Sequence, residues 1–182
     1  MQYFTFCESP LGRITLYSDG TNLTGLGFER QKYPPYTQGG NCENLKRDDD
    51  LKIFDGMKKW LLEYFAGKQP SAKAIPLAPE GSPFRREIWR LLSEIPYGEV
   101  TTYGQLAARA AANPRKDRMS AQAVGGAVSH NPISIIIPCH RVVGANGSLT
   151  GYGGGMEKKI WLLTHEGIDM KRFTIPTCGT AI

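Results

Sequence analysis

The chain has 182 residues, of which 41% are hydrophobic and 21% charged, a composition typical of a globular protein and unlike that of a disordered chain. Its formal net charge of +5 permits a polyanionic partner without requiring one. The N-terminus lacks the basic segment and apolar core of a signal peptide, and no apolar run is long enough to cross a membrane. We therefore expect an intracellular, cytoplasmic protein that is not inserted in a membrane.

Residues 2–7, 13–18 and 23–28 alternate apolar and polar side chains, which predicts three short strands. The polar segment 30–50 contains prolines and glycines and predicts a loop. The spacing of apolar residues from 53 to 65 predicts an amphipathic helix that ends at Gly67. Residues 68–81 are rich in proline and predict a linker. The first predicted domain, residues 1–75, therefore combines strands with one helix.

The second predicted domain spans residues 82–172 and is mainly helical. Ser82 and Pro83 form a typical helix start, and Thr102 with Gln105 has the spacing of a capping box at the head of a helix over 102–112. Small residues at 120–128 predict another short helix, and a final helix over 156–166 ends near Gly167.

The helices at 102–112 and 120–128 are similar to a helix-turn-helix, whose second helix can lie in a DNA groove. A tight helix–helix contact is an equally good explanation, because small residues serve both purposes. Arg109, Arg115, Lys116 and Arg118 lie just before the second helix, although a charge run is more often a solvated surface.

The segment Pro138-Cys139-His140-Arg141 carries the strongest chemical signal. It follows an apolar run at 133–137, which predicts a buried strand that ends at the proline. A histidine and an arginine beside a thiol favour the thiolate, the nucleophilic form. The alternative is that Cys139 is a small buried hydrophobic residue. The four cysteines form no CxxC pair and no ligand spacing with the histidines, so we expect free thiols and no metal site.

Several blocks of residues between Ser82 and Asp169 resemble the O6-alkylguanine-DNA alkyltransferase family. They include Ser82-Pro83-Phe84, Pro96-Tyr97-Gly98, Tyr103-Gly104-Gln105-Leu106-Ala107, Ala123-Val124-Gly125-Gly126-Ala127, Asn131-Pro132, Ile137-Pro138-Cys139-His140-Arg141, Gly151-Tyr152-Gly153-Gly154 and Trp161-Leu162-Leu163 with His165-Glu166-Gly167. The resemblance implies an α/β (α+β) fold. A small antiparallel sheet with a helix, similar to ribonuclease H, would precede a helical domain with a winged-helix-like helix-turn-helix.

The resemblance implies that Cys139 accepts an alkyl group, His140 takes the thiol proton through a bound water, and Glu166 orients that histidine. Tyr103 would donate its hydroxyl to the guanine ring, and Asn131 would bridge the helix-turn-helix to the cysteine segment. The residues implied to line the substrate pocket are Val128, Tyr152, Gly153 and Arg141.

The implied partner is double-stranded DNA that contains O6-alkylguanine, with the base flipped out of the duplex and the protein acting once, without a cofactor and as a monomer. The family inserts an arginine from the second helix into the DNA, whereas the aligned residue here is Gln122. The preceding loop is also longer than usual, and Arg118 could supply the missing charge. The candidate DNA-binding residues are Gln122, Ala121, Gly125 and Arg118.

Two other functions fit parts of the sequence. A cysteine hydrolase could use Cys139, His140 and Glu166, although a histidine directly after the nucleophile argues against it. A DNA-binding regulator could use the helix-turn-helix alone. However, Gln122 is the main side chain of the second helix able to read base edges, so sequence-independent minor-groove binding fits better.

Overall fold

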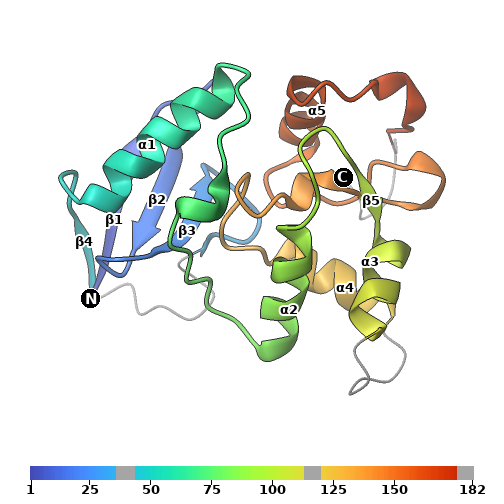
Figure 1. Ribbon diagram of the computed structural model, residues 1–182, viewed down its shortest axis with the longest axis horizontal. Coiled ribbons are helices and arrows are strands. Elements are labelled where there is room, and N and C mark those ends of the chain that lie inside the picture. Colours follow the sequence, from blue (N-terminus) through green and yellow to red (C-terminus); the bar gives the residue numbers. More distant parts are fainter. Residues whose placement is uncertain (36–43, 113–119, 176–182) are drawn as a thin grey trace. The chain divides into compact units, whose positions relative to one another are not determined.

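The computed structural model describes residues 1–35, 44–112 and 120–175, and the chain divides into two compact units (Figure 1). The first unit contains Met1–Gly81 together with Pro132–Ile136, and the second contains Ser82–Asn131 and Ile137–Ile182. The sequence places residues 132–136 inside the second predicted domain, whereas the structure assigns them to the first unit. None of the described helices is both long and apolar enough to span a membrane.

The first unit is built on a four-stranded sheet with the order β3-β2-β1-β4. The three predicted strands are present and pair antiparallel. The fourth strand pairs parallel with β1 and lies within the segment predicted to be a loop, so that prediction was wrong there. Its sequence has no apolar alternation, and it is a strand because it pairs with the edge of β1. The strands are β1 (Gln2–Cys7), β2 (Ile14–Ser18), β3 (Leu23–Phe28) and β4 (Leu45–Arg47).

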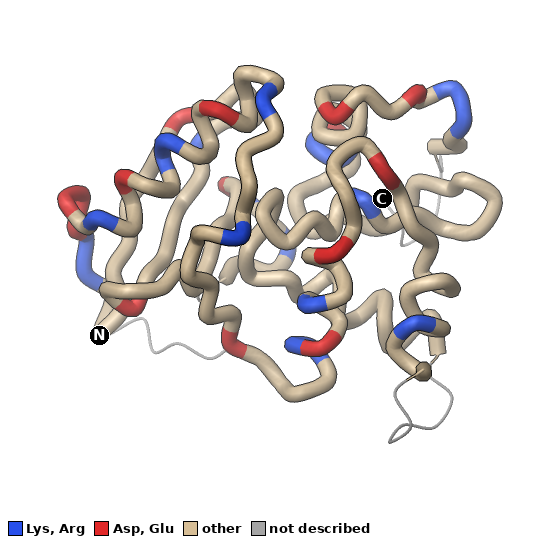
Figure 2. Tube along the Cα trace, in the orientation of Figure 1, with Lys and Arg blue, Asp and Glu red and all other residues tan. Residues whose placement is uncertain are grey.

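Helix α1 (Lys52–Phe65) lies across one face of this sheet (Figure 1). As predicted, it ends before Gly67, whose φ of 78° is a conformation that glycine adopts without strain. Acidic and basic residues are interspersed along the helix (Figure 2). The buried residues of the helix recur at helical spacing and are Phe54, Met57, Leu61 and Tyr64.

Two segments outside strands β1 to β4 extend the sheet beyond β3. Leu77, in the predicted linker, forms a parallel bridge with Leu23, and Ile133 forms one with Leu26. The amide of Leu26 donates to Pro132 O at 2.8 Å, and the amide of Ser134 donates to Leu26 O at 2.9 Å. The chain just before the cysteine motif is therefore anchored to the first unit.

The strand predicted at 133–137 does not form, although its residues are buried as expected. After the single bridge at Ile133 the chain turns, with Ile136 N donating to Ser134 O at 2.8 Å. Ile135 has a φ of 69°, which is unusual for a β-branched residue. Burial of an apolar run does not distinguish a strand from a compact turn, and here the turn redirects the chain toward Cys139.

The second unit is mainly helical, and the predicted helix starts are confirmed. Ser82 caps the first helix by accepting from Arg85 N, and Thr102 with Gln105 forms the predicted capping box. Trp89 donates from Nε1 to Ala127 O at 2.9 Å and so joins the first and third helices. The described elements of this unit are α2 (Pro83–Leu92), β5 (Thr101–Thr102), α3 (Tyr103–Ala111), α4 (Ala121–Ser129), β6 (Val142–Val143) and α5 (Met156–His165).

Candidate active site

Cys139 begins a short 3₁₀ helix, η4 (Cys139–Arg141), directly after Pro138, and only 6% of it is exposed. Asn131, two residues after the end of α4, donates from Nδ2 to the Cys139 sulfur at 3.0 Å. The same amide group donates to Ile137 O at 2.7 Å. The buried side chain of Asn131 therefore holds the turn that carries the cysteine and also directs a hydrogen-bond donor toward the sulfur.

Burial raises the pKa of Cys139, and the hydrogen bond from Asn131 and the charge of Lys159 act against that effect. We expected His140 and Arg141 to favour the thiolate, but neither does so by its charge. Burial lowers the pKa of His140 and keeps its ring neutral, and the guanidinium of Arg141 is paired with Glu166. The positive charge that acts on the sulfur comes from Lys159, which lies outside the sequence motifs.

His140 and Glu166 form a buried hydrogen bond, with Nε2 2.9 Å from Oε1. Burial alone would raise the pKa of Glu166, but hydrogen bonds from His140 and Arg141 outweigh it and hold that pKa well below its usual range. Since an ionised carboxylate only accepts, we assign the proton of the neutral ring to Nε2. His140 Nδ1 is then a buried acceptor with no hydrogen-bond partner among the described residues. It is available to a water molecule and to a proton.

The resemblance implies that Arg141 lines the substrate pocket, but its side chain points to Glu166 instead. Its Nε and Nη2 donate to the two oxygens of Glu166, at 2.7 and 2.9 Å. Its Nη1 donates to Ile95 O at 2.6 Å, and its guanidinium lies over the ring of Tyr97. All three nitrogens are engaged inside the protein. The position of Arg141 is therefore that of a clamp on Glu166 and not of a residue open to substrate.

Tyr103, the first residue of α3, directs its hydroxyl toward the glycine-rich segment after β6. The hydroxyl oxygen lies 3.4 Å from Thr150 O and 3.3 Å from Gly151 O. Burial, followed by the charge of Cys139, raises the pKa of Tyr103 to about 12. The phenol therefore remains a hydrogen-bond donor throughout the physiological pH range.

Comparison with known proteins agrees with this geometry. The model of the 6-O-methylguanine DNA methyltransferase ribonuclease-like domain matches residues 2–79, and the model of the DNA binding domain of the same methyltransferase matches residues 83–168. The chain belongs to the 6-O-methylguanine DNA methyltransferase family. The fold class inferred from the sequence is thereby confirmed, since the described structure pairs a small sheet with a helical second unit.

Individual members of the 6-O-methylguanine DNA methyltransferase family resemble the chain over most of its length. The methylated-DNA--protein-cysteine methyltransferase of Haemophilus influenzae is 45% identical, over 91% of this chain and 87% of the relative. The protein of the same name from Methanosarcina acetivorans is 42% identical, over 91% and 98%. Mycobacterium tuberculosis O6-methylguanine methyltransferase has a TM-score of 0.77 at 38% identity, over 91% and 93%. A crystal structure of Mycobacterium tuberculosis OGT in complex with DNA also has a TM-score of 0.77, at 37% identity and 94% coverage of both chains.

In this family member, Lys159 is fully buried on α5. Its Nζ donates to Val142 O at 2.7 Å and to Thr150 O at 2.8 Å. Burial lowers its pKa to about 8, against a smaller opposite effect of Cys139. No motif in the sequence marks Lys159 as a site residue. Its position was the one signal that could have predicted its burial. Residue 159 lies three residues after Met156 and four residues before Leu163, on the apolar stripe of the helix.

The remaining site residues predicted from the sequence lie on α4 and on the glycine-rich segment. Val128 is buried, and the ring of Tyr152 lies edge-on to that of His140, with centroids 6.4 Å apart. Gly153 is half-buried. Gln122 and Ala121 are exposed at the start of α4, and Gly125 lies beside the ring of Tyr103. Arg118, like Arg115 and Lys116, falls outside the described residues.

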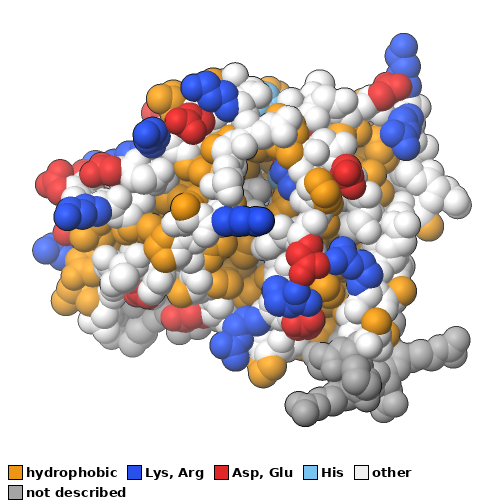
Figure 3. Space-filling model, in the orientation of Figure 1, with side chains coloured by type: hydrophobic (Ala, Val, Ile, Leu, Met, Phe, Trp, Pro, Cys, Tyr) orange, Lys and Arg blue, Asp and Glu red, His pale blue; other side chains and the backbone are white. Residues whose placement is uncertain are grey.

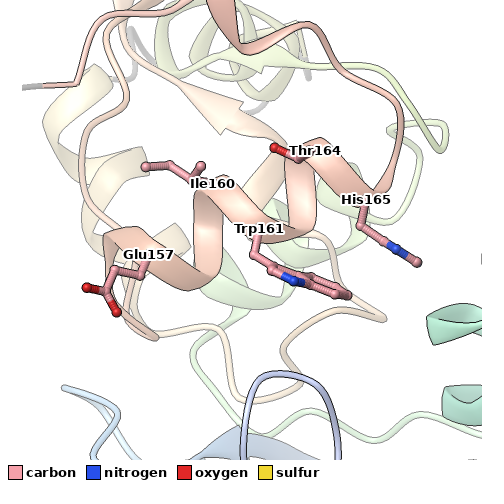
Figure 4. A pocket seen from close by; sticks show the side chains of 5 residues that line it. All are labelled: Glu157, Ile160, Trp161, Thr164 and His165. Carbon is pink, nitrogen blue, oxygen red and sulfur yellow. The ribbon is translucent and has the colours of Figure 1, made fainter.

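A separate hollow of about 550 Å³ lies on the outer surface of α5 (Figure 4). Trp161 and His165 stack there, with ring centroids 4.8 Å apart. The hollow does not include the cysteine. On the molecular face drawn in Figure 3, acidic and basic side chains lie beside one another, so positive charge is not concentrated there. Among the described residues, no group of three His, Cys, Asp or Glu side chains could hold a metal ion.

Proposed function

We propose that this chain repairs duplex DNA by transferring the alkyl group of an O6-alkylguanine to its own Cys139. The observation that carries the proposal is the arrangement of a buried thiol beside a neutral histidine whose other nitrogen is held by an ionised glutamate. Membership of the 6-O-methylguanine DNA methyltransferase family and the methyltransferase names of its relatives support it. Thiolate sulfur is a strong, soft nucleophile suited to attack on an alkyl carbon.

Activation begins with removal of the thiol proton. Because burial raises the pKa of Cys139, the thiol is protonated in the resting protein and needs a nearby base. His140 supplies that base at Nδ1, through one water molecule, and becomes a cation that the Glu166 carboxylate stabilises. Arg141 keeps the carboxylate ionised and correctly oriented, and Asn131 donates a hydrogen bond to the sulfur as it gains charge.

Transfer then forms a bond between the sulfur and the alkyl carbon and breaks the bond between that carbon and guanine O6. The electron pair of the broken bond stays on guanine. Tyr103 donates a proton to the base and regains one from the histidine, so guanine leaves uncharged. Because the resulting thioether is not reversed by any step of this scheme, each molecule acts once. All groups in the scheme come from one chain, and we propose that it acts as a monomer.

DNA engagement falls to α4, which presents Gln122 and Ala121 to solvent at its N-terminal end. The small side chains of this helix let its backbone approach the minor groove closely, and they read little sequence. The relative from Mycobacterium tuberculosis crystallised in complex with DNA supports this partner. The target base must rotate out of the duplex to reach Cys139, which costs a few kcal/mol.

The test is intact mass spectrometry of the protein after incubation with a duplex that contains one O6-methylguanine, followed by peptide mapping. We expect one added methyl group per molecule, located on Cys139 and absent from Cys139→Ala. Cys7→Ala, which removes a thiol of the first unit, should gain the same mass as the wild type and is the matched control. No added mass, with or without lesion binding, would refute alkyl transfer, and cleavage of a thioester substrate instead would favour the hydrolase.

A further inference from the structure

The last described segment of the chain pairs with a turn beside the glycine-rich segment. Residues 172–174, here called the C-terminal strap, form this pairing. Thr174 makes a parallel bridge with Ser148. The amide of Leu149 donates to Thr174 O at 2.9 Å, and the amide of Thr174 donates to Gly147 O at 3.0 Å. Two backbone hydrogen bonds therefore tie the strap to the turn.

Gly147 is a position where the strap and the turn come very close together. A Cβ atom added to Gly147 would lie 2.7 Å from Arg172 O, closer than Cβ contacts in proteins. Gly147 also has a φ of 73°, a conformation that favours glycine. Phe173 packs against a buried apolar cluster that includes Leu149 and Leu163. The strap is therefore held by backbone pairing, by close approach and by apolar contact.

The turn at 144–148 determines where the chain enters the proposed active site. Gly144 directly follows β6, which pairs with β5 just before Tyr103. The amide of Gly144 donates to Ser148 O at 2.7 Å and closes the turn. Thr150 lies two residues further along the chain. Because β6 holds the start of the turn and the strap holds its end, the strap helps to set the position of Thr150.

The Tyr103 hydroxyl is the reactive group that this backbone path affects. It faces the carbonyl oxygens of Thr150 and Gly151, at 3.4 and 3.3 Å. Thr150 O also accepts from Lys159 Nζ at 2.8 Å, so one atom is held independently from α5. Loss of the strap would therefore shift the two carbonyls without releasing them, and the phenol would lose part of its alignment. A misplacement of about 1 Å can slow a reaction by up to about 100-fold.

We propose that the C-terminal strap is a positioning element for alkyl transfer: by pairing with residues 147–149, it aligns the Tyr103 hydroxyl with the departing base. This inference rests on the proposed function, which makes Tyr103 the proton donor. The strap acts through the turn and not on the substrate. The pairing itself is a property of the protein alone and is measurable without DNA.

The first test breaks the pairing with Thr174→Pro, which removes the amide that donates to Gly147 O. Phe173 is already extended, with φ −122° and ψ 149°, a conformation allowed before proline. The matched control is Ile175→Pro, one residue later, whose amide takes no part in the pairing. We expect hydrogen exchange at the Leu149 amide to become about tenfold faster in Thr174→Pro and to stay at the wild-type rate in Ile175→Pro.

The second test asks whether the strap acts through Tyr103. With an O6-methylguanine duplex in single-turnover experiments, we expect Thr174→Pro to lower the maximal rate about tenfold and to leave the half-saturating DNA concentration unchanged. In a Tyr103→Phe background the same change should cost less than about twofold, because the group that the strap aligns is absent. A general loss of stability would instead lower the rate equally in both backgrounds, and that result would overturn the proposal.

A second pair of variants covers the case in which Thr174→Pro does not fold, which near-ultraviolet circular dichroism detects. Gly147→Ala places a Cβ atom against Arg172 O and should reproduce the faster exchange and the slower transfer. Gly67→Ala, the matched control, has a similar φ of 78° but open space around its Cβ atom, and it should change neither. Equal rates of methyl transfer in these two variants would also reject the positioning role.

The two proposals fail in different ways. If the wild type transfers no methyl group, the proposed function falls, and the alignment role of the strap falls with it. If the wild type transfers a methyl group and Thr174→Pro does so at the same rate, the proposed function stands and the strap alone is rejected. Faster exchange at Leu149 together with unchanged transfer would show that the pairing exists but does not position Tyr103.

Discussion

Arg141 binds both oxygens of the Glu166 carboxylate, with Nε 2.7 Å from Oε2 and Nη2 2.9 Å from Oε1. His140 approaches the same Oε1, at 2.9 Å. The buried group thus contains one anion, one permanent cation and one neutral ring. In this arrangement the glutamate can orient the histidine without drawing a proton onto it in the resting state, which leaves His140 Nδ1 able to accept one.

Removing the guanidinium should therefore affect stability and chemistry together. We expect Arg141→Met to lower the free energy of unfolding by about 3–5 kcal/mol, because it leaves a buried carboxylate without its cation. The pKa of His140 should rise, since the lost cation no longer opposes its protonation. Urea denaturation and the rate of methyl transfer at pH 7 measure the two effects.

The matched control is Arg90→Met, which removes an exposed arginine of α2 that pairs with Glu87 and with Glu94, just beyond the helix. An exposed pair contributes at most about 1 kcal/mol, so this variant should unfold almost as the wild type does and react at the same rate. Equal destabilisation of the two variants would contradict the structural role assigned to Arg141.

Asn131→Asp preserves the shape of a side chain that donates to both the sulfur and Ile137 O. The change removes both donors and places a negative charge beside the developing thiolate. We expect the pH midpoint of the transfer rate to rise by about one unit and the rate at pH 7 to fall about tenfold. Stopped assays across pH 6–10 measure this. Asn22→Asp, in the turn between β2 and β3, serves as the control and should change neither quantity.

How far the sequence predicts the fold depends on whether the signal is local. Helix starts at Ser82 and Thr102 were predictable because a cap is completed within three residues of chain. Strand β4 was not, because its three residues become a strand only by pairing with β1. The run at 133–137 is apolar enough for a strand, but Asn131 and the short hydrogen bond between Ser134 and Ile136 make it a turn.

In the candidate site, too, residues with a local sequence signal were predictable and residues that depend on distant contacts were not. Cys139, His140 and Glu166 follow from the motif blocks, and the structure brings the last two into contact. The role of Arg141 was not predictable, because its place beside the cysteine in sequence does not show that its side chain turns to Glu166. Lys159 lies twenty residues from the cysteine in a charged stretch, and only the orientation of α5 shows that it is buried.

Gln122 stands where the resemblance implies an arginine that enters the duplex, and its side chain lies exposed near the start of α4. An uncharged side chain fills the space left by a flipped base but offers no cation to the surrounding phosphates. We expect Gln122→Arg to speed methyl transfer from duplex DNA severalfold and to leave the reaction with free O6-methylguanine unchanged. Single-turnover kinetics on the two substrates measure this. Faster reaction with both, or with neither, would argue against a role in base flipping.

The buried lysine should also leave a signature in the pH dependence of stability. Its pKa is about 8 in the folded protein, against an ordinary value of 10.5. Between these values the unfolded chain binds more protons than the folded protein, so this group stabilises the fold increasingly as the pH rises. The gain should reach about 3 kcal/mol by pH 10.5.

The comparison that isolates this gain is urea unfolding of Cys139→Ala with and without Lys159→Met, from pH 7 to 10.5. Removing the thiol eliminates its own titration, and it also lowers the folded pKa of Lys159, so the rise should begin no higher than about pH 8. Cys7 and Tyr103, whose pKa values are raised, titrate alike in both proteins and cancel in the difference. A constant difference in unfolding free energy across this range would show that folding does not lower the pKa of Lys159, as for an amine accessible to water. A difference that starts to rise only above pH 7 would identify a charge that the fold retains at pH 7 despite its cost in stability, whereas a full slope already at pH 7 would identify a neutral amine.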